Sequence, residues 1–327
     1  MSRNLSVSII IVNYNQSQFL EQAILSAINQ DPVEVEVIVV DDGSSDESED
    51  ILRKYQDSTR IIRQQNSGAC AARNAGLAIA NGRYVKFLDA DDWLLQGVIT
   101  QQIKYLESIN LPRGFVVSGC PIWVTQERDA QYDADLVDVE LNEIPLSKLI
   151  QGSPLTSCPL HHRSDLVSVG GFDERVRRGQ EHDLHLRLAL NGVRFYHHES
   201  PVYFYRQHDP ANRISGWRGC DVAKSMHEAS MRRIDIAKQK LEAPWPDCIR
   251  EAFAKRLWRE GRECLQRGAY EYGSMFFREA RKMYRKAPVY GGRMYQILAK
   301  VFGPRSAERL SHARADAINL VFRVLKR

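Results

Sequence analysis

The N-terminal half of the chain alternates short apolar runs with segments whose apolar residues recur at helical spacing. The apolar runs predict strands over Ser6–Val12, Glu34–Val40, Arg60–Gln64 and Tyr84–Leu88. Helices are predicted between them, over about Phe19–Ile28, Ser45–Lys54 and Ser67–Ile79. Strands separated by helices of this length form βαβ units, so we expect an α/β domain with a mostly parallel sheet flanked by helices.

The pattern changes twice farther along the chain. After about residue 95 the runs become shorter, with a helix predicted over Glu181–Leu190 and short strands over Val193–His197 and Pro201–Tyr205. From about Ser215 onward the pattern is helical. We therefore expect an α/β domain over residues 1–215 and an all-helical subdomain over residues 216–327.

The helical part carries two weaker patterns. Leu257 to Pro288 resembles one tetratricopeptide-type hairpin, but a single repeat cannot bury its apolar face, so an ordinary helical subdomain is favoured. The basic segment Arg305 to Arg327 could place Ile318, Val321, Phe322 and Leu325 on one apolar face. Such a face permits peripheral contact with an anionic membrane, although simple packing is the favoured alternative.

Composition narrows the class of protein without naming it. The chain has 327 residues, with 43% hydrophobic and 26% charged residues, which is typical of a soluble globular protein. Its net charge of +4 is small for this length, so we expect no nucleic-acid partner. The six cysteines form no metal-binding spacing, and no run reaches the roughly 20 apolar residues of a membrane span. With the first strand starting at about Leu5, we expect a cytoplasmic protein without a signal peptide.

The end of the strand Tyr84–Leu88 is rich in carboxylates. Asp89, Asp91 and Asp92 follow it directly, and alternate residues of an extended segment share a face. Asp89 and Asp91 can therefore converge on one cation, and carboxylate oxygens suit Mg²⁺ or Mn²⁺ carrying a phosphorylated substrate. An Asp-rich turn that caps the next helix is the structural alternative.

Two further motifs follow predicted strands. In the first, Val39 to Ser44, a carboxylate at the strand end could accept hydrogen bonds from a nucleotide base or ribose; the alternative is a turn that caps the next helix, and the two are compatible. In the second, Asn66 to Gly76, small residues let a helix N-terminus approach an anion, and Arg73 adds a forked cationic contact. An Ala-rich packing helix is the alternative here.

These motifs together with Gly170-Gly171-Phe172-Asp173-Glu174 and the acidic helix from Gln180 resemble a family 2 glycosyltransferase of the GT-A fold. The resemblance covers about residues 5–210. It implies an inverting enzyme that takes a UDP-, GDP- or dTDP-sugar donor and Mn²⁺ or Mg²⁺. It also implies a glycan or glycolipid acceptor, with cell-surface polysaccharide or lipopolysaccharide synthesis as the usual setting, at the cytoplasmic face of the membrane.

The resemblance also assigns expected roles by position. The expected nucleotide-sugar contacts are Asn13, Tyr14, Asp42, Arg73 and Asp89. The expected metal-site residues are Asp89, Asp91, Asp92 and His208, and the lone His208 has a structural role as its alternative. The C-terminal helices lie outside the resemblance. We expect them to contact the acceptor, a membrane surface or another subunit.

The general base departs from the family pattern. The family usually places Glu-Asp at the start of the helix after Gly-Gly-Phe-Asp-Glu, whereas this chain has Gln180-Glu181 there. An inverting displacement needs a carboxylate that accepts the proton of the attacking hydroxyl. Glu181 occupies the Asp position and is our choice of base, with Asp183 as the rival.

Two other functions stay open at this point. A non-catalytic carbohydrate-binding protein could keep this fold, and the Gln180 departure is compatible with it. A nucleotidyltransferase is the second alternative, but it would carry a Gly-rich, Arg-containing loop where this chain has Asn13-Tyr14-Asn15-Gln16. A dehydrogenase is disfavoured because no Gly-x-Gly-x-x-Gly motif follows a strand.

Overall fold

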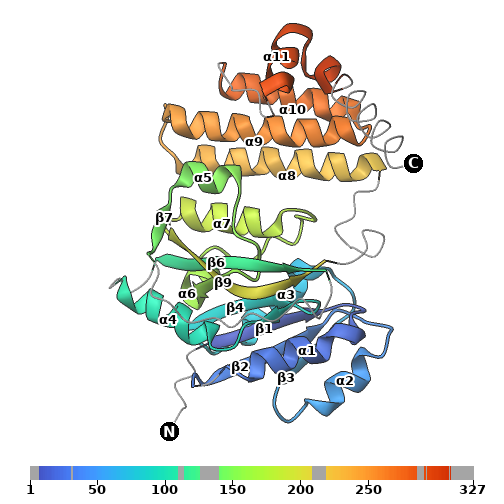
Figure 1. The fold of residues 1–327 in the computed structure, drawn as a ribbon, viewed down its shortest axis with the longest axis vertical. Helices are drawn as coiled ribbons and strands as arrows, with labels where there is room; N and C mark the ends of the chain where they lie inside the picture. Colours follow the sequence, from blue (N-terminus) through green and yellow to red (C-terminus); the bar gives the residue numbers. More distant parts are fainter. Residues whose placement is uncertain are drawn as a thin grey trace, which may run out of the picture. The chain divides into compact units, whose positions relative to one another are not determined.

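The computed structural model describes residues 7–30, 32–109, 114–125, 140–207, 219–285, 291, 293–308 and 310. The chain divides into two compact units (Figure 1). The first comprises Met1–Pro145 and Ser153–Gly216, and the second comprises Leu146–Gly152 and Trp217–Arg327. His208 and almost all of the basic segment Arg305 to Arg327 lie outside the described residues.

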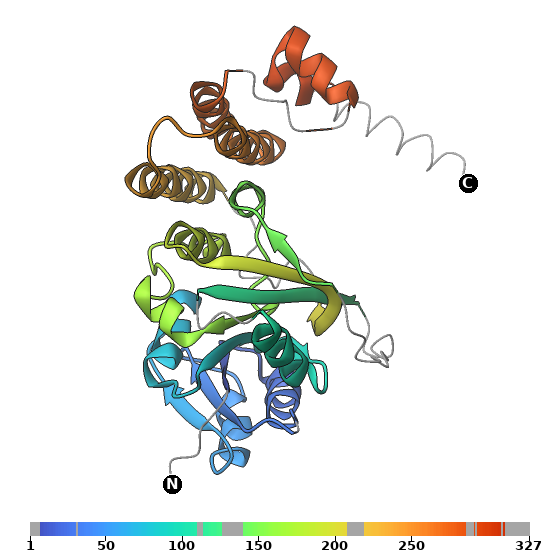
Figure 2. The same ribbon diagram turned by 90° about the vertical axis from the view of Figure 1, so that its left-hand side faces the viewer.

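One sheet forms the centre of the first unit, with helices packed on it (Figure 2). Its strands are β1 (Val7–Asn13), β2 (Val35–Asp41), β3 (Arg60–Arg63), β4 (Tyr84–Asp89), β5 (Trp93–Leu94), β6 (Phe115–Val124), β7 (Asn142–Ile144), β8 (Pro159–His162) and β9 (Arg194–Arg206). The helices are α1 (Ser17–Ile28), α2 (Ser48–Lys54), α3 (Ala69–Ile79), α4 (Val98–Ser108), α6 (Arg163–Ser168) and α7 (Gln180–Leu190). The strand order is β3-β2-β1-β4-β8-β6-β9-β5, and β7 pairs with β9.

The first four strands in the chain run parallel, as the βαβ pattern predicts. Asn13 at the end of β1 pairs in register with Asp41 of β2, and Val12 pairs with Asp89 of β4. Antiparallel pairing of β8 with β4 and β6 then makes the sheet mixed. The acidic ends of β2 and β4 therefore flank β1 at one edge of the sheet, which is where open α/β sheets bind ligands.

Helix α3 packs unusually closely on the sheet. A Cβ atom on Gly76 would lie 2.4 Å from Cγ2 of Ile10, so only glycine fits against β1 at this point. Ala72 on the same helix is fully buried. The Ala-rich packing helix proposed as an alternative is thus part of the structure, and the same helix carries Arg73.

Two sequence-based boundaries are wrong. Helix α2 begins at Ser48 rather than Ser45, because the Asp46 carboxylate accepts the Ser48 amide (3.1 Å) in a turn before the helix. The two short strands expected at Val193–His197 and Pro201–Tyr205 form one strand, β9. Its pairing with β6 shifts register beside Cys120, the partner of Pro201, and this irregularity lets the strand continue through proline.

The second unit is helical. Its helices are α5 (Leu146–Gln151), α8 (Gly219–Lys240), α9 (Asp247–Gln266), α10 (Tyr270–Met283) and α11 (Arg293–Phe302). Helices α9 and α10 form a closely packed hairpin, because a Cβ atom on Gly261 would lie 3.0 Å from Cβ of Phe276. In the described part of the chain, no helix is long and apolar enough to cross a membrane.

Candidate active site

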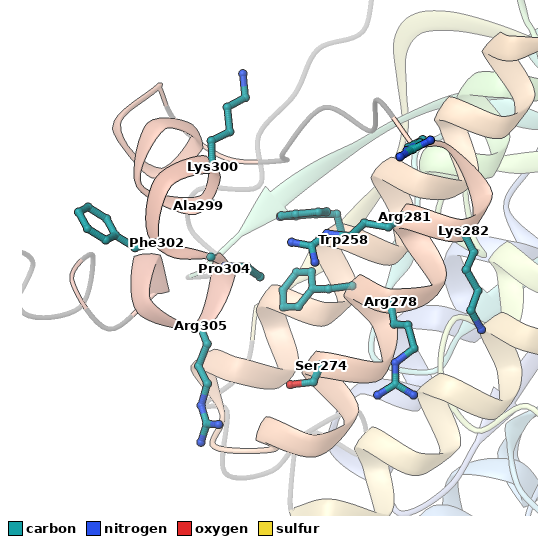
Figure 3. Close-up of a pocket in the computed structure, with 13 residues that line it drawn as sticks. Trp258, Ser274, Arg278, Arg281, Lys282, Ala299, Lys300, Phe302, Pro304 and Arg305 are labelled. Carbon is teal, nitrogen blue, oxygen red and sulfur yellow. The ribbon is translucent and has the colours of Figure 1, made fainter.

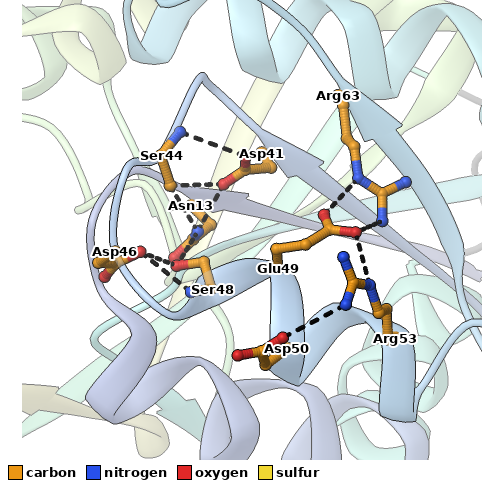
Figure 4. Close-up of polar contacts among 9 residues, drawn as sticks. All are labelled: Asn13, Asp41, Ser44, Asp46, Ser48, Glu49, Asp50, Arg53 and Arg63. Carbon is orange, nitrogen blue, oxygen red and sulfur yellow. Dashed lines mark hydrogen bonds and ion pairs between the residues drawn. The ribbon is translucent and has the colours of Figure 1, made fainter.

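Asn13 organises the loop that follows β2 (Figure 4). Its side-chain amide donates to Oδ1 of Asp41 (2.7 Å) and approaches the hydroxyls of Ser44 (3.0 Å) and Ser48 (2.9 Å). Asn13 is fully buried, so these contacts replace the hydration of its side-chain nitrogen. The end of β1 therefore fixes the Asp-Asp-Gly-Ser turn, whose Gly43 has a positive φ of 78°. Tyr14, the next residue, is partly buried in the turn after β1.

Asp42 ties the end of β2 to the loop that precedes α3. Its carboxylate accepts hydrogen bonds from the amides of Ser67 (2.9 Å) and Gly68 (2.8 Å) and from the side chain of Gln64 (2.7 Å). Only 2% of the residue is exposed. The expected contact between Asp42 and a nucleotide base stays a prediction, and in this structure the carboxylate orders the loop.

Arg73 connects two parts of the site. Its Nη2 donates to Oδ1 of Asp89 (2.7 Å), and its Nη1 donates to Oε1 of Gln180 (2.7 Å). Burial by itself would lower the pKa of Arg73, but the Asp89 carboxylate raises that pKa above its ordinary value. The guanidinium also lies over the ring of Phe172, 5.2 Å from its centre. One buried cation thus joins the end of β4 to the first turn of α7.

The three carboxylates after β4 are close to one another. Burial raises the pKa of Asp92 well above its ordinary value, and the charges of Asp91 and Asp89 raise it further. One oxygen of Asp92 accepts the Arg206 amide (3.0 Å), and Nε of Arg206 donates to the Asp91 carbonyl (3.1 Å). Asp92 therefore links this turn to the end of β9.

The donor set fits a divalent cation that is shared with a substrate. In the described residues, no three His, Cys, Asp or Glu side chains are arranged to hold a metal ion. Asp89 and Asp91 nevertheless both lie close enough to Asp92 for their charges to raise its pKa, and 38% of the Asp89 side chain is exposed. Mg²⁺ in phosphate chemistry is commonly held by one or two carboxylates plus substrate phosphates, so two protein carboxylates suffice. His208 lies outside the described residues.

The two candidates for the base have different surroundings. Asp183 is 1% exposed and pairs with Nε of Arg187 at 2.8 Å, one turn farther along α7. Glu181 is partly exposed, follows Gln180 directly, and is one of the charges that raise the pKa of Arg73. On accessibility the geometry therefore favours Glu181, while Asp183 fixes the helix.

Asn74 and Gln180 each join two motifs, which the sequence did not reveal. Gln180 does so by accepting the hydrogen bond from Arg73. The Asn74 side chain accepts the Phe172 amide (2.8 Å) and donates to the Phe172 carbonyl (2.9 Å). It thereby clamps the loop at Gly171, whose φ is +66°. The signal was present, because Asn74 stands beside Arg73 in one motif and Phe172 lies in another. A single sequence does not show that the two motifs touch.

Solved structures define the class of fold. S. aureus TarS matches 93% of this chain and 55% of its own chain, with a TM-score of 0.64 and 19% identity. TarS residues 1–349 in complex with UDP-GlcNAc match with a TM-score of 0.57 and 17% identity, over 88% of this chain and 94% of that chain. Pyrobaculum calidifontis mannosyltransferase PcManGT, solved with GDP-Man and Mn²⁺, matches with a TM-score of 0.56 and 18% identity, over 95% and 87%. The fold is of the GT-A type.

Sequence comparison gives a family match over part of the chain. Residues 8–128 match the sequence model described as Glycosyl transferase family 2. It is 41% identical over 104 residues to the Escherichia coli protein named UDP-Glc:alpha-D-GlcNAc-diphosphoundecaprenol beta-1,3-glucosyltransferase WfaP, which is 31% of this chain and 41% of that protein. An uncharacterized glycosyltransferase of Rickettsia prowazekii, RP339, is 30% identical over 59% of this chain and 61% of its own length. The chain spans less than two thirds of these relatives.

Proposed function

We propose that this protein is an inverting glycosyltransferase that moves a sugar from a nucleoside-diphosphate sugar to a hydroxyl acceptor. The observation that carries the proposal is the chain of contacts from Asp89 through Arg73 to Gln180. An inverting displacement needs a leaving-group site and a base around one anomeric carbon. The buried arginine holds the elements that would supply these two functions next to each other.

The donor side of the site comprises the ends of β1, β2 and β4. The turn at Asn13 and Tyr14 and the loop ordered by Asp42 would surround the nucleoside, with Arg73 and Asp89 near the ribose and phosphates. The structural relatives solved with UDP-GlcNAc and GDP-Man support a nucleotide-sugar donor without choosing between nucleotides. The GDP-Man relative also contains Mn²⁺.

Asp89 and Asp91 would hold a divalent cation together with the donor diphosphate, with Asp92 supporting them from its buried position. The cation, Mn²⁺ or Mg²⁺, supplies electrostatic stabilisation of the departing nucleoside diphosphate. Glu181 would accept the proton of the attacking hydroxyl. Asp183 would position α7 through its ion pair with Arg187.

The acceptor is proposed to be a glycan or glycolipid in cell-surface polysaccharide synthesis. The E. coli relative is named for an acceptor linked to diphosphoundecaprenol, which supports a lipid-linked acceptor here. We place the enzyme in the cytoplasm or at the inner face of the membrane, where such acceptors meet nucleotide-sugars.

A nucleotide-sugar panel tests the proposal directly. With Mn²⁺ and a suitable donor, the protein should release nucleoside diphosphate, and Asp91→Ala should abolish turnover and weaken metal-dependent donor binding. We expect a loss of at least about 10²- to 10³-fold, the scale seen when one electrostatic stabiliser is removed. Pyrophosphate release would instead indicate a nucleotidyltransferase. Binding of sugars without turnover for any donor would indicate a non-catalytic carbohydrate-binding protein.

A further inference from the structure

A pocket of about 1070 Å³ lies between α10 and the end of α11 in the second unit (Figure 3). Its floor is aromatic, with Trp258 and Phe277, and its rim is cationic. The rim cations are Arg278, Arg281, Lys282, Arg285, Lys300 and Arg305. Among the described residues that line the pocket, none is acidic.

Most of this positive charge has no carboxylate partner in the part of the chain that the structure describes. In the described part of the chain, Lys282 has a carboxylate partner, Glu279 at 2.8 Å, whereas the other five rim cations have none within ion-pair distance. Arg281 lies over the Trp258 ring, 5.9 Å from its centre, which positions the guanidinium without cancelling its charge. Five exposed cations around one hollow, with no carboxylate partner among the described residues, are complementary to phosphate groups.

The helix that borders the pocket also exposes apolar side chains. Ile297, Val301 and Phe302 of α11 are 58%, 65% and 60% exposed. Figure 3 shows the Phe302 side chain pointing away from Trp258. Arg293 and Lys300 flank Ile297 and Val301 on the exposed face, while Tyr295 and Ala299 are buried on the other. An apolar strip edged by cations is the pattern of a helix that lies in a membrane interface.

Charge is distributed unevenly along the whole sequence. Residues 270–327 contain 13 of the 45 Lys and Arg residues but 4 of the 41 Asp and Glu residues. This segment therefore carries a formal charge of +9, and the rest of the chain carries −5. Such asymmetry is typical of a segment that meets a polyanionic surface.

We propose that the pocket between α10 and α11 binds the phosphates of anionic phospholipids, with Ile297, Val301 and Phe302 entering the headgroup layer. A soluble phosphate compound would use the cations but not the exposed aliphatic side chains. Nucleic acid would use the cations and stack on aromatic rings, but isoleucine and valine offer no surface for stacking. A lipid surface uses both features of this face.

Vesicle flotation tests the proposal with the full-length protein. The vesicles are phosphatidylcholine alone, or phosphatidylcholine mixed with an equal amount of phosphatidylglycerol. The wild-type protein should float with the mixed vesicles alone, and binding should fall as salt is added. Arg285→Glu/Lys300→Glu should weaken binding by at least about 25-fold, because each basic residue near an anionic surface contributes about fivefold.

Matched variants distinguish binding through this surface from the effects of net charge and of exposed apolar residues elsewhere on the protein. Lys224→Glu/Lys240→Glu makes the same charge change on exposed positions of α8 and should bind more tightly than Arg285→Glu/Lys300→Glu. Val301→Ser should weaken binding, whereas Val167→Ser, at a 55% exposed valine of α6, should not. Circular dichroism checks that each variant is folded.

Three results would overturn the proposal. One is wild-type binding that is equal for both vesicle types. Another is an equal loss in the two charge-reversal variants. The third is binding of inorganic pyrophosphate or single-stranded nucleic acid that depends on Arg285 and Lys300, without vesicle binding. None of these measurements depends on catalytic activity, so the proposed glycosyl transfer is tested separately.

Discussion

The strand ends of the first unit and the pocket rim of the second unit differ in how their charges are paired. In the first, the polar residues at the strand ends are buried and paired: Asp42 has three donors, and Arg73 bridges Asp89 and Gln180. In the second, the cations around the pocket are exposed and mostly without carboxylate partners in the described residues. Paired charges hold a site in one geometry. Cations without a carboxylate partner can instead gain electrostatic free energy when an anionic ligand binds.

Glu181→Gln should have the largest effect on the activity of the first unit. Glu181 lies next to Gln180, which Arg73 links to Asp89, and its side chain is partly exposed. We expect turnover to fall by about 10²- to 10⁴-fold, the range for a general base, with donor affinity nearly unchanged. Steady-state kinetics and donor titration in Mn²⁺ measure the two effects.

Asp183→Asn is the companion variant. It should lower the free energy of unfolding, because it weakens the buried ion pair with Arg187. Full activity in Glu181→Gln would move the base assignment to Asp183.

Asn74→Ala removes a member of the paired network that touches no expected substrate atom. It leaves the Phe172 amide and carbonyl without this partner, so unfolding free energy should fall by about 1–3 kcal/mol. Urea denaturation measures the loss. Asn191→Ala, at a position where the side chain makes a long 3.3 Å contact with Ser168, is the control and should cost less. An equal cost in both variants would show that the Gly171 loop does not depend on Asn74.

Lys86 is an exception to the charge pairing in the first unit. It is buried, and the two groups that accept its hydrogen bonds are neutral. Its ammonium donates to Oε1 of Gln102 (2.8 Å) and the Cys158 carbonyl (2.9 Å). Burial lowers the pKa of Lys86 to about 7. Between about pH 7 and pH 10 the unfolded chain therefore holds a proton that the folded chain lacks, and below pH 7 both hold it.

This proton balance determines whether stability rises or falls with pH. Across that window, wild-type stability should rise with pH relative to Lys86→Met by about 1.4 kcal/mol per pH unit. Urea unfolding of both proteins at several pH values gives the difference. A constant difference would mean that Lys86 is not neutral in the folded protein.

Much of the first unit follows from local sequence. Buried strands such as Val7–Asn13 and Val35–Asp41 are mostly apolar runs, and their ends carry the motif residues, so the α/β sheet is confirmed. The contacts between motifs could not be predicted, since Arg73 and Gln180 are 107 positions apart. The antiparallel insertion of β8 between β4 and β6 was also missed, because it depends on distant pairing rather than on periodicity.

The basic pocket had no motif to reveal it. Its residues come from α9, α10, α11 and the segments that follow α10 and α11, and almost all are ordinary surface cations or apolar residues in the sequence. A single exposed cation predicts nothing, because most are simply hydrated. The pocket arises from the convergence of helices.

Gly76 gives the site an unexpected dependence. Arg73 lies three residues before Gly76, nearly one turn earlier on α3. The helix can pack this close to β1 because Gly76 has no side chain to meet Ile10. An added methyl group would push the helix outward and draw the guanidinium away from both of its partners at once. A residue without a side chain therefore determines how far the Arg73 guanidinium reaches toward Asp89 and Gln180.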